Sequence, residues 1–304
     1  MRRLSPAALR TTAAIAAALV AAAPAAARAC SVCSRGDPLA SLAEGHGAEG
    51  RLRLSLETEY LTQQGAMEGS PTQRHDLQQV LLRAGASWTP LSSLDLVASV
   101  PFGRKKLEMQ GATVPMSDLT GLGDLDVGAR WFFWEAVNLR ARQRQGLALT
   151  VGSSLPTGSR DPGAVEHGQV GTGAFGPYAG LAYRLQRDAF AAVLSVSGRV
   201  HDANGQGYRY GSALLGTAQG LWTPTGWLVL GAGMDLHDEG RDRRNGLPVA
   251  NTGGLVVWAS PSAFLKVYRE LWFSLRVQVP VHSALLGIQE VGAVGVAGFQ
   301  YQAM

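Results

Sequence analysis

Apolar and polar residues alternate along parts of the chain with the period of two that is typical of a β-strand. Residues 271–282 read LWFSLRVQVPVH, so every second position from Leu271 to Val281 is apolar. The positions between them are mostly polar and include Arg276 and Gln278. Successive side chains of a strand point to opposite faces, so this stretch has one apolar and one charged face. The same pattern recurs at residues 51–60, 190–201 and 226–237.

Twelve such stretches predict an all-β fold of about twelve strands, although glycine blurs the alternation in two of them, 168–186 and 207–222. The predicted strands are residues 51–62, 73–88, 93–102, 119–134, 146–156, 168–186, 189–201, 207–222, 226–237, 252–267, 271–282 and 290–302. An even number of antiparallel strands is typical of a bacterial transmembrane β-barrel.

The connections between these strands alternate in length. Tight ones are expected at Thr89–Ser92, Arg187–Asp188, Thr223–Thr225 and Tyr268–Glu270. The others, at 63–72, 103–118, 157–167, 202–206, 238–251 and 283–289, are mostly longer and richer in Gly, Pro and charge. Short periplasmic turns and longer outer loops are the expected asymmetry of an outer-membrane barrel. The long basic connection 135–145 departs from this rule, and we expect a periplasmic turn with a helical piece there.

Aromatic side chains gather near the predicted short-turn ends of the strands. They are Trp88, Trp131, Phe132, Phe133, Trp134, Trp222, Trp227, Trp272, Phe299 and Tyr301. Amphipathic rings are favoured at the membrane–water boundary, so this distribution indicates a periplasmic girdle. The competing folds, a soluble β-sandwich or a solenoid, give aromatic residues no reason to collect at one end.

The N-terminus has the pattern of a secretory signal peptide. A basic start precedes the apolar stretch 11–22, which is too short for a permanent membrane anchor, and an A-x-A cleavage pattern ends at Ala29. We therefore predict a cleaved signal peptide at 1–29, a periplasmic segment at 30–50 and a transmembrane β-barrel at 51–304.

The charge balance gives no reason to expect a nucleic-acid partner. The chain of 304 residues carries 27 basic and 23 acidic residues, but four of the arginines lie in the predicted signal peptide. The remaining chain holds 23 of each sign. Its basic character is therefore a property of the leader, and no basic binding surface is indicated.

Three glycine-rich motifs resemble one family of outer-membrane proteins. Residues 119–134 read LTGLGDLDVGARWFFW, residues 155–158 read LPTG, and residues 171–184 read GTGAFGPYAGLAYR. These blocks resemble the outer-membrane family labelled for the meta-pathway of phenol degradation, whose architecture is similar to that of the long-chain fatty acid and toluene channels. The resemblance implies an outer-membrane barrel that passes small or hydrophobic compounds.

If the apolar face meets lipid, the polar face lines the interior, because an arginine facing the bilayer midplane costs about 2–4 kcal/mol. The predicted lumen-lining residues are Arg53, Glu57, Glu59, Arg83, Asp95, Asp124, Asp126, Arg130, Arg199, Gln219, Asp235, Arg276 and Gln278. Two interpretations stay open: a water-containing path whose charges set selectivity, and a set of salt bridges that plugs a narrow barrel. For Asp124, Asp126 and Arg130, which share one face, we favour structural or pore-lining pairing over catalysis.

Five histidines, His75, His167, His201, His237 and His282, lie at or near predicted outer loops. They come from five different hairpins, and the sequence shows no convergence of the kind that a metal site needs. The alternation puts the last three on the inner face, whereas a lipid hydrolase of this architecture would carry a Ser–His pair on the outer wall. A G-x-S-x-G nucleophile motif is also absent from the sequence.

The predicted mature N-terminus, CSVCSRGDP, holds two cysteines in C-x-x-C spacing. Cys30 and Cys33 could form a disulfide in an oxidising periplasm, or bind a soft metal or take part in redox chemistry, with His46 as the nearby third ligand. Acylation of Cys30 is a further alternative. We expect this segment to hang in the periplasm or to plug the barrel mouth.

These features predict a channel or transporter of the cell outer membrane that passes small molecules through a charged lumen and is not an enzyme. One alternative is a structural or assembly protein of the outer membrane with a periplasmic C-x-x-C metal or redox segment. A lipid hydrolase is the other. The expected partners are outer-membrane lipid, a small-molecule solute and, for the C-x-x-C segment, a periplasmic protein. No cofactor is expected apart from a metal at Cys30 and Cys33.

Overall fold

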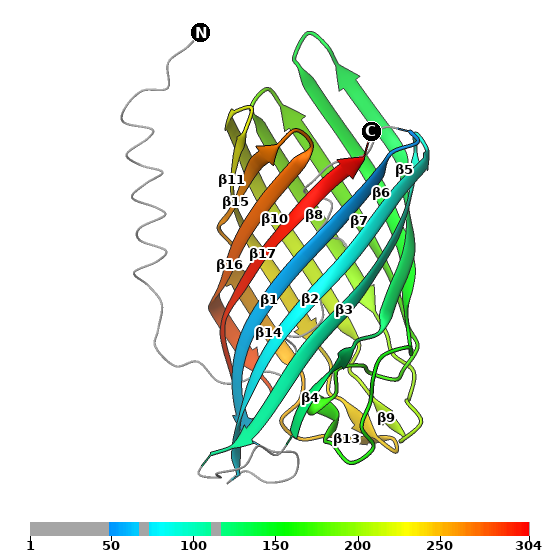
Figure 1. Ribbon diagram of the computed structural model, residues 1–304, viewed down its shortest axis with the longest axis vertical. Helices are drawn as coiled ribbons and strands as arrows, with labels where there is room; N and C mark the ends of the chain where they lie inside the picture. The colour runs from blue at the N-terminus through cyan, green and yellow to red at the C-terminus, as the bar shows by residue number, and fades with distance from the viewer. Residues whose placement is uncertain (1–48, 67–72, 111–116, 304) are drawn as a thin grey trace.

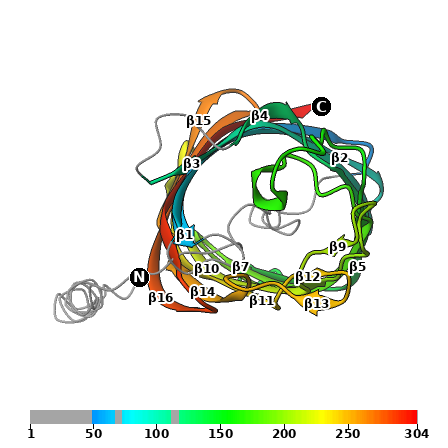
Figure 2. The same cartoon turned by 90° about the horizontal axis from the view of Figure 1, so that it is seen from below.

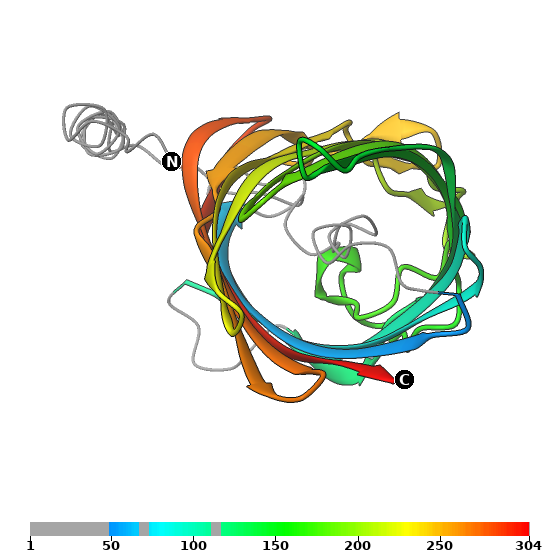
Figure 3. The same ribbon diagram turned by 90° about the horizontal axis from the view of Figure 1, so that it is seen from above.

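The computed structural model describes residues 49–66, 73–110 and 117–303. These residues form a closed antiparallel β-barrel of twelve strands, seen end-on as a ring in Figures 2 and 3. The order of strands around the ring follows the chain, and the first strand pairs with the last to close it. The predicted barrel is therefore confirmed.

Ten positions in the ring hold one continuous strand each. They are β1 (Leu52–Ala66), β2 (Arg74–Leu91), β3 (Leu94–Met109), β6 (Gln143–Leu155), β7 (Gly176–Arg187), β8 (Phe190–Arg199), β10 (Ala213–Thr225), β11 (Leu228–Glu239), β16 (Leu271–Leu285) and β17 (Gln289–Ala303).

The other two positions are each divided into two strands. The first is shared by β4 (Ser117–Leu122) and β5 (Leu125–Asn138), which both pair with β3. The second is shared by β14 (Gly254–Ala259) and β15 (Ser262–Tyr268), which both pair with β11 and β16. Pro261, which has no N–H to donate, stands at the second break. Asp124 stands at the first, and its side chain has a structural role described below.

The two ends of the barrel differ (Figure 1). Strands at the top of the figure are joined by short turns, and those at the bottom by longer loops. The loops carry the 3-10 helix η2 (Glu166–Gly168) and a small sheet of β9 (Tyr208–Arg209), β12 (Arg243–Arg244) and β13 (Leu247–Pro248). By the usual asymmetry of such barrels, the bottom end is the outer mouth and the top end faces the periplasm.

The outward side chains form an apolar belt around the barrel. On β1 the exposed positions are Leu52, Leu54, Leu56 and Tyr60, and β16 exposes a similar row. The row on β1 matches the roughly 9–11 residues that a tilted strand needs to cross a bilayer. Figure 1 shows this tilt. The belt is what a lipid-facing wall requires, because exposed leucine rows on this scale are unfavourable in water.

Aromatic side chains lie exposed at the periplasmic end of the belt. They are Trp88, Trp131, Phe133, Trp134, Phe190, Trp222, Trp227, Tyr268, Phe299 and Tyr301. Trp272 differs, since it is only half-exposed and its ring lies 5.7 Å from the Lys266 ammonium. The sequence alternation had placed this ring on the polar face.

A charged pair on the outer wall lies beyond the apolar belt on the side of the outer mouth, at the outer ends of β3 and β4. The Arg104 guanidinium donates two hydrogen bonds to the Asp118 carboxylate, at 2.6 and 2.7 Å. These bonds lower the pKa of Asp118 below its usual range. Both groups are exposed, so the pair marks water rather than lipid beside this part of the wall.

Several sequence-based boundaries need correction. The strand predicted at 93–102 continues to Met109, well into the predicted loop 103–118. The strands predicted at 168–186 and 207–222 begin later, at Gly176 and Ala213, because the preceding residues are loops that pack at the outer mouth. The connection 135–145 holds no helical piece: β5 continues to Asn138, β6 begins at Gln143, and a short turn joins them. Figure 1 shows this hairpin, in green, rising above the other turns.

His282 faces outward, contrary to the expectation from alternation. The ladder between β14 and β16 is shifted between Val257 and Trp258, so that Val257 pairs with His282 but Trp258 pairs with Pro280. The extra residue at this bulge reverses the alternation for the rest of the strand. His201 and His237 are buried on the inner side, as expected.

Within the described parts of the chain, no helix has the length and apolar character needed to cross a bilayer. The predicted signal peptide, Cys30, Cys33 and His46 lie outside the described residues.

Candidate functional site: the barrel lumen

The strand register places twelve of the thirteen predicted lumen residues on the inner face of the barrel. The thirteenth, Asp124, lies at the break between β4 and β5 and is buried. Their charges are largely matched by neighbours. Arg83 stands directly opposite Glu57 in the β1–β2 ladder, and the Gln79 amide donates to Glu59 at 3.4 Å. On the far wall, Gln219 donates to Ser262 at 3.0 Å.

Two of the predicted arginines pair with predicted carboxylates inside the wall. Arg130 lies 3.9 Å from Asp95, and both side chains are almost completely buried, with 1% and 0% exposure. Asp95 also accepts a hydrogen bond from the Thr89 hydroxyl at 2.7 Å. Arg199 reaches Asp126 at 3.3 Å from three strands away. The structure therefore supplies the pairing partners that the sequence could not name.

Asp235 anchors a third polar group on β11. It accepts hydrogen bonds from Thr217 on β10 at 2.8 Å, from Gln278 on β16 at 2.7 Å, and from the Ser260 hydroxyl. The carboxylate thus links four consecutive positions of the ring: β10, β11, the break between β14 and β15, and β16.

One part of the inner wall is apolar, which alternation did not predict. It consists of Leu61, Val256, Trp258, Val291 and Val294, all at most 5% exposed. These residues come from β1, β14 and β17. The lumen is therefore a mixed surface, with charged and apolar sectors.

A single carboxylate, Asp124, holds the outer loop 156–175 inside the barrel. Its Oδ1 accepts a hydrogen bond from the Gly158 N–H at 2.9 Å. Its Oδ2 accepts from both the N–H and the hydroxyl of Thr172, each at 2.6 Å. Gly158 and Thr172 lie near opposite ends of the loop, so one side chain ties both ends to the wall. As Figures 2 and 3 show, η2, drawn in green, lies within the ring.

Two glycines let the ends of this loop touch. A Cβ on Gly158 would lie 2.6 Å from the Cα of Gly171, and one on Gly171 would lie 2.7 Å from the Cα of Gly158. Neither position has room for a side chain. Asp124, Gly158 and Thr172 each come from a different motif of the family resemblance. The three motifs therefore meet at one point in space, the root of the loop.

Two further glycines make room for Tyr178 on the inner wall: Gly128, which lies in the first motif, and Gly152. A Cβ on Gly128 would lie 2.7 Å from the Tyr178 hydroxyl, and one on Gly152 would overlap the ring. The Arg199 guanidinium lies 5.1 Å from the centre of this ring, within the range of a cation–π contact. The glycines thus seat the ring that helps to position the Arg199–Asp126 pair.

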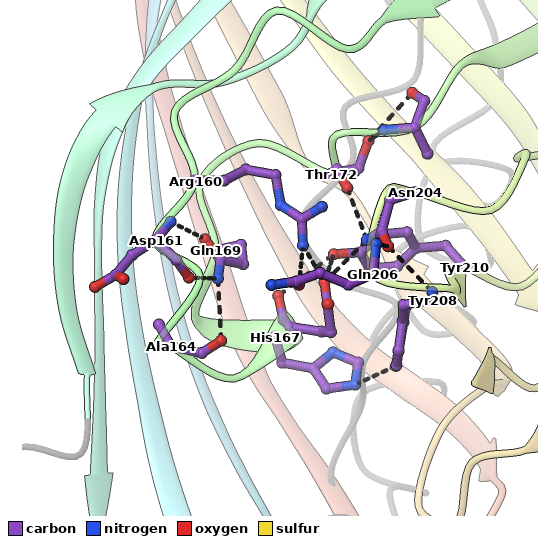
Figure 4. Close-up of polar contacts among 12 residues, drawn as sticks. Arg160, Asp161, Ala164, His167, Gln169, Thr172, Asn204, Gln206, Tyr208 and Tyr210 are labelled. Carbon is purple, nitrogen blue, oxygen red and sulfur yellow. Dashed lines mark hydrogen bonds and ion pairs between the residues drawn. The ribbon is translucent and has the colours of Figure 1, made fainter. Parts of the chain in front are cut away.

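The tip of the loop is fixed by a buried carboxylate, Glu166, which is 4% exposed. Its Oε2 accepts hydrogen bonds from Arg160 at 2.7 Å, from Asn204 at 3.2 Å and from Tyr210 at 3.3 Å. Figure 4 shows that Arg160 approaches from the loop itself, while Asn204 and Tyr210 come from the connection after β8. Arg160 also donates to Gln206 at 3.0 Å.

A second link joins η2 to the loop between β11 and β14. The Tyr208 hydroxyl donates to Asp242 at 2.6 Å and lies 3.2 Å from Nε2 of His167. His167 therefore joins an outer-mouth network rather than standing alone in a loop (Figure 4). In the described residues, no group of three or more His, Cys, Asp and Glu side chains is placed to hold a metal ion.

Two small cavities adjoin η2, and His167 lines both. One, of about 70 Å³, is lined by Arg83, Lys105, Asp126 and Arg199 among others. The other, of about 190 Å³, lies toward Gln63 and Leu107. Both of these spaces beside the loop are narrow and partly charged.

The sequence analysis missed Arg160, Glu166, Asn204, Tyr208 and Asp242 as parts of this region. They lie in connections that carry no periodicity. The available signal was the pair of glycine motifs, LPTG and GTG, that flank the loop.

The closed barrel, its apolar belt and its aromatic boundary define an outer-membrane β-barrel protein, which confirms the predicted location in the cell outer membrane. The chain belongs to the family described as "Putative MetA-pathway of phenol degradation", whose model matches residues 89–276, more than half of the chain. The family resemblance is therefore confirmed.

Among solved structures, the chain is similar to an outer membrane channel from Pseudomonas putida F1, with 13% identity and a TM-score of 0.67 over 88% of this chain and 100% of that one. Weaker likenesses are to the translocator domain of the autotransporter NalP from Neisseria meningitidis (16% identity, 86% and 92% coverage, TM-score 0.46) and to the CymD monoaromatic hydrocarbon channel (10%, 88% and 91%, TM-score 0.43). None of the curated proteins matches the chain in sequence.

Proposed function

We propose that this protein is a narrow channel that passes small molecules across the outer membrane. The observation that carries the proposal is the seating of loop 156–175 inside the outer mouth by Asp124. A loop held in this way narrows the lumen without filling it, because two cavities remain beside η2. A purely structural barrel would have no need of an inserted loop rooted by one carboxylate.

The lining of these spaces supports passage of polar or amphipathic solutes. Arg83, Lys105 and Arg199 stand near Asp126 and Glu166, so both signs of charge face the path. Rings of fixed charge set selectivity in channels of this kind. The family and the similar channel from Pseudomonas putida F1 are consistent with transport rather than enzymatic activity.

The test is single-channel recording of the refolded protein in a planar bilayer. We expect small, discrete steps for the wild type and roughly doubled steps for Asp124→Ala, because Gly158 and Thr172, near opposite ends of the loop, both lose their hydrogen bonds to Asp124. Asp202→Ala, which removes an exposed carboxylate from the loop after β8, is the matched control. A heat-modifiable band on a gel establishes that each variant folds. Folded wild-type and Asp124→Ala barrels that both lack conductance would overturn the proposal.

A further inference from the structure

A second charged region of the lumen lies in the periplasmic half, on the inner faces of β6 and β7. Arg144 is opposite Gln186 in the ladder between these strands, and Arg184 is two residues before Gln186. The two arginines are therefore diagonal neighbours on one face, within reach of long side chains.

Glu135 is the carboxylate that acts on both guanidinium groups, and it forms hydrogen bonds with Arg144 alone. Arg144 donates to both oxygens of Glu135, at 3.0 and 3.1 Å. Arg184 donates to the Gln186 side chain at 3.3 Å, and its Nε is buried with no hydrogen-bond partner in the described structure. Arg53 on β1 adds a further positive field at Arg184. A buried donor on a cation is costly to leave unsatisfied, so the site is suited to an incoming acceptor.

The arginines stand beside a recess with an apolar floor. The recess has a volume of about 50 Å³, and its floor is made by Phe132, Ala148, Ala182 and Val193. Ala182 and Val193 are in contact and almost fully buried. Apolar side chains next to free guanidinium donors fit a molecule with a compact apolar body and one charged end.

The recess opens toward the periplasm. Phe132, Glu135 and Arg144 also line a wider hollow of about 650 Å³ at the periplasmic rim. A solute in the recess therefore has an adjoining space into which it can leave.

We propose that this recess is a binding site for small amphipathic monocarboxylates on their way through the lumen. The Arg184 and Arg144 guanidinium groups receive the carboxylate, and the floor receives the apolar body. Arg144, Arg184 and Glu135 together carry one net positive charge, which a monoanion neutralises. The planar guanidinium also matches the two oxygens of a carboxylate. The inference rests on the proposed channel function, because the solute must reach the lumen.

Direct binding tests the site independently of transport. Calorimetric titration of the refolded protein in detergent compares benzoate with benzyl alcohol, a neutral molecule of similar size. We expect benzoate to bind more tightly, and Arg184→Gln to weaken benzoate about tenfold while leaving benzyl alcohol unchanged. Arg142→Gln, in the exposed β5–β6 turn, is the matched control and should change neither. Equal benzoate affinity in wild type and Arg184→Gln would overturn the site.

Uptake into liposomes separates this inference from the channel proposal. If benzoate binds through Arg184 but no solute enters the liposomes, the channel proposal fails and the site stands. If solutes enter and Arg184→Gln leaves the ratio of benzoate to benzyl alcohol uptake unchanged, the channel stands and the site fails. If uptake occurs and the ratio falls, both are supported.

Discussion

The two halves of the lumen are narrowed by different means. At the outer mouth, the loop 156–175 enters the barrel and is held by side-chain hydrogen bonds, chiefly to Asp124 and Glu166. In the periplasmic half, the narrowing groups are side chains of the wall itself, such as Arg130 and Arg184. A loop can leave the lumen without breaking a strand ladder, whereas the wall residues are fixed to hydrogen-bonded strands. For the proposed channel, this contrast predicts gating in the outer half and selection in the inner half.

The strongest test of this contrast is to expel the loop by steric means. Gly171→Val places a side chain against the Gly158 backbone, where even a Cβ would lie 2.7 Å from the Cα, 2.8 Å from the carbonyl carbon and 3.1 Å from the carbonyl oxygen of Gly158. We expect roughly doubled single-channel steps with unchanged barrel stability. Gly163→Val is the control, since a Cβ there meets only the Asp161 carboxylate at 3.4 Å. Unchanged conductance in folded Gly171→Val would place the narrowest point elsewhere.

In the periplasmic half, removing one side chain of a buried ion pair should destabilise the barrel wall itself. Arg130→Met removes one partner of a buried ion pair and leaves Asp95 uncompensated, which costs about 3–5 kcal/mol of unfolding free energy. Urea unfolding of the refolded barrel measures this loss. The double variant Arg130→Met with Asp95→Asn should recover part of it. A single variant as stable as the wild type would show that the pair contributes nothing to the wall.

A smaller loss of stability is expected when the link between η2 and the loop between β11 and β14 is weakened. Tyr208→Phe removes a hydroxyl that donates to Asp242 and lies beside His167, at a cost of about 1–3 kcal/mol to the local packing of the loops. We expect faster cleavage of the outer loops by added protease and no change in the urea midpoint of the barrel. Tyr301→Phe, on the exposed outer wall, is the control. A lowered urea midpoint of the barrel would mean that the outer loops and the barrel wall unfold together as one cooperative unit.

The smallest effect should come from Cys30 and Cys33, which lie outside the described residues. If Cys30 and Cys33 form a disulfide, the purified protein has no free thiol until it is reduced, and replacing both with serine changes neither barrel stability nor conductance. Thiol titration, metal analysis and bilayer recording measure the three quantities. Loss of bound metal or altered transport in the serine variant would support the metal or redox alternative.

The barrel could be predicted because its physical cause is local and repeated. Each strand has one row of side chains that faces lipid and one that faces the lumen. The alternating apolar residues from Leu271 to Val281 are therefore visible directly in the sequence. The alternation also placed the charged residues inward, including Arg130 and Asp235. It failed at His282, where a bulge that leaves no sequence signal reverses the faces.

The outer mouth could not be predicted because its contacts are distant in sequence. Asp124 and Thr172 are separated by 48 residues, and Tyr210 and Glu166 by 44. Nothing in the alternation links such positions. The glycines at 158 and 171 were the sequence signal for this loop. They are needed because the two ends of the loop touch, and that contact exists only in the folded chain.

The pairing of β1 with β17 has a consequence for how the barrel assembles. Leu52 lies opposite Ala303, so the first and last strands meet across almost the whole length of the described chain. Contacts between such distant residues make folding slow, since the entropy of closing so long a loop opposes their formation. Until β17 arrives, two strand edges stay open, and open edges promote aggregation. A chain shortened by its last strand would therefore lose the ring itself rather than one twelfth of it.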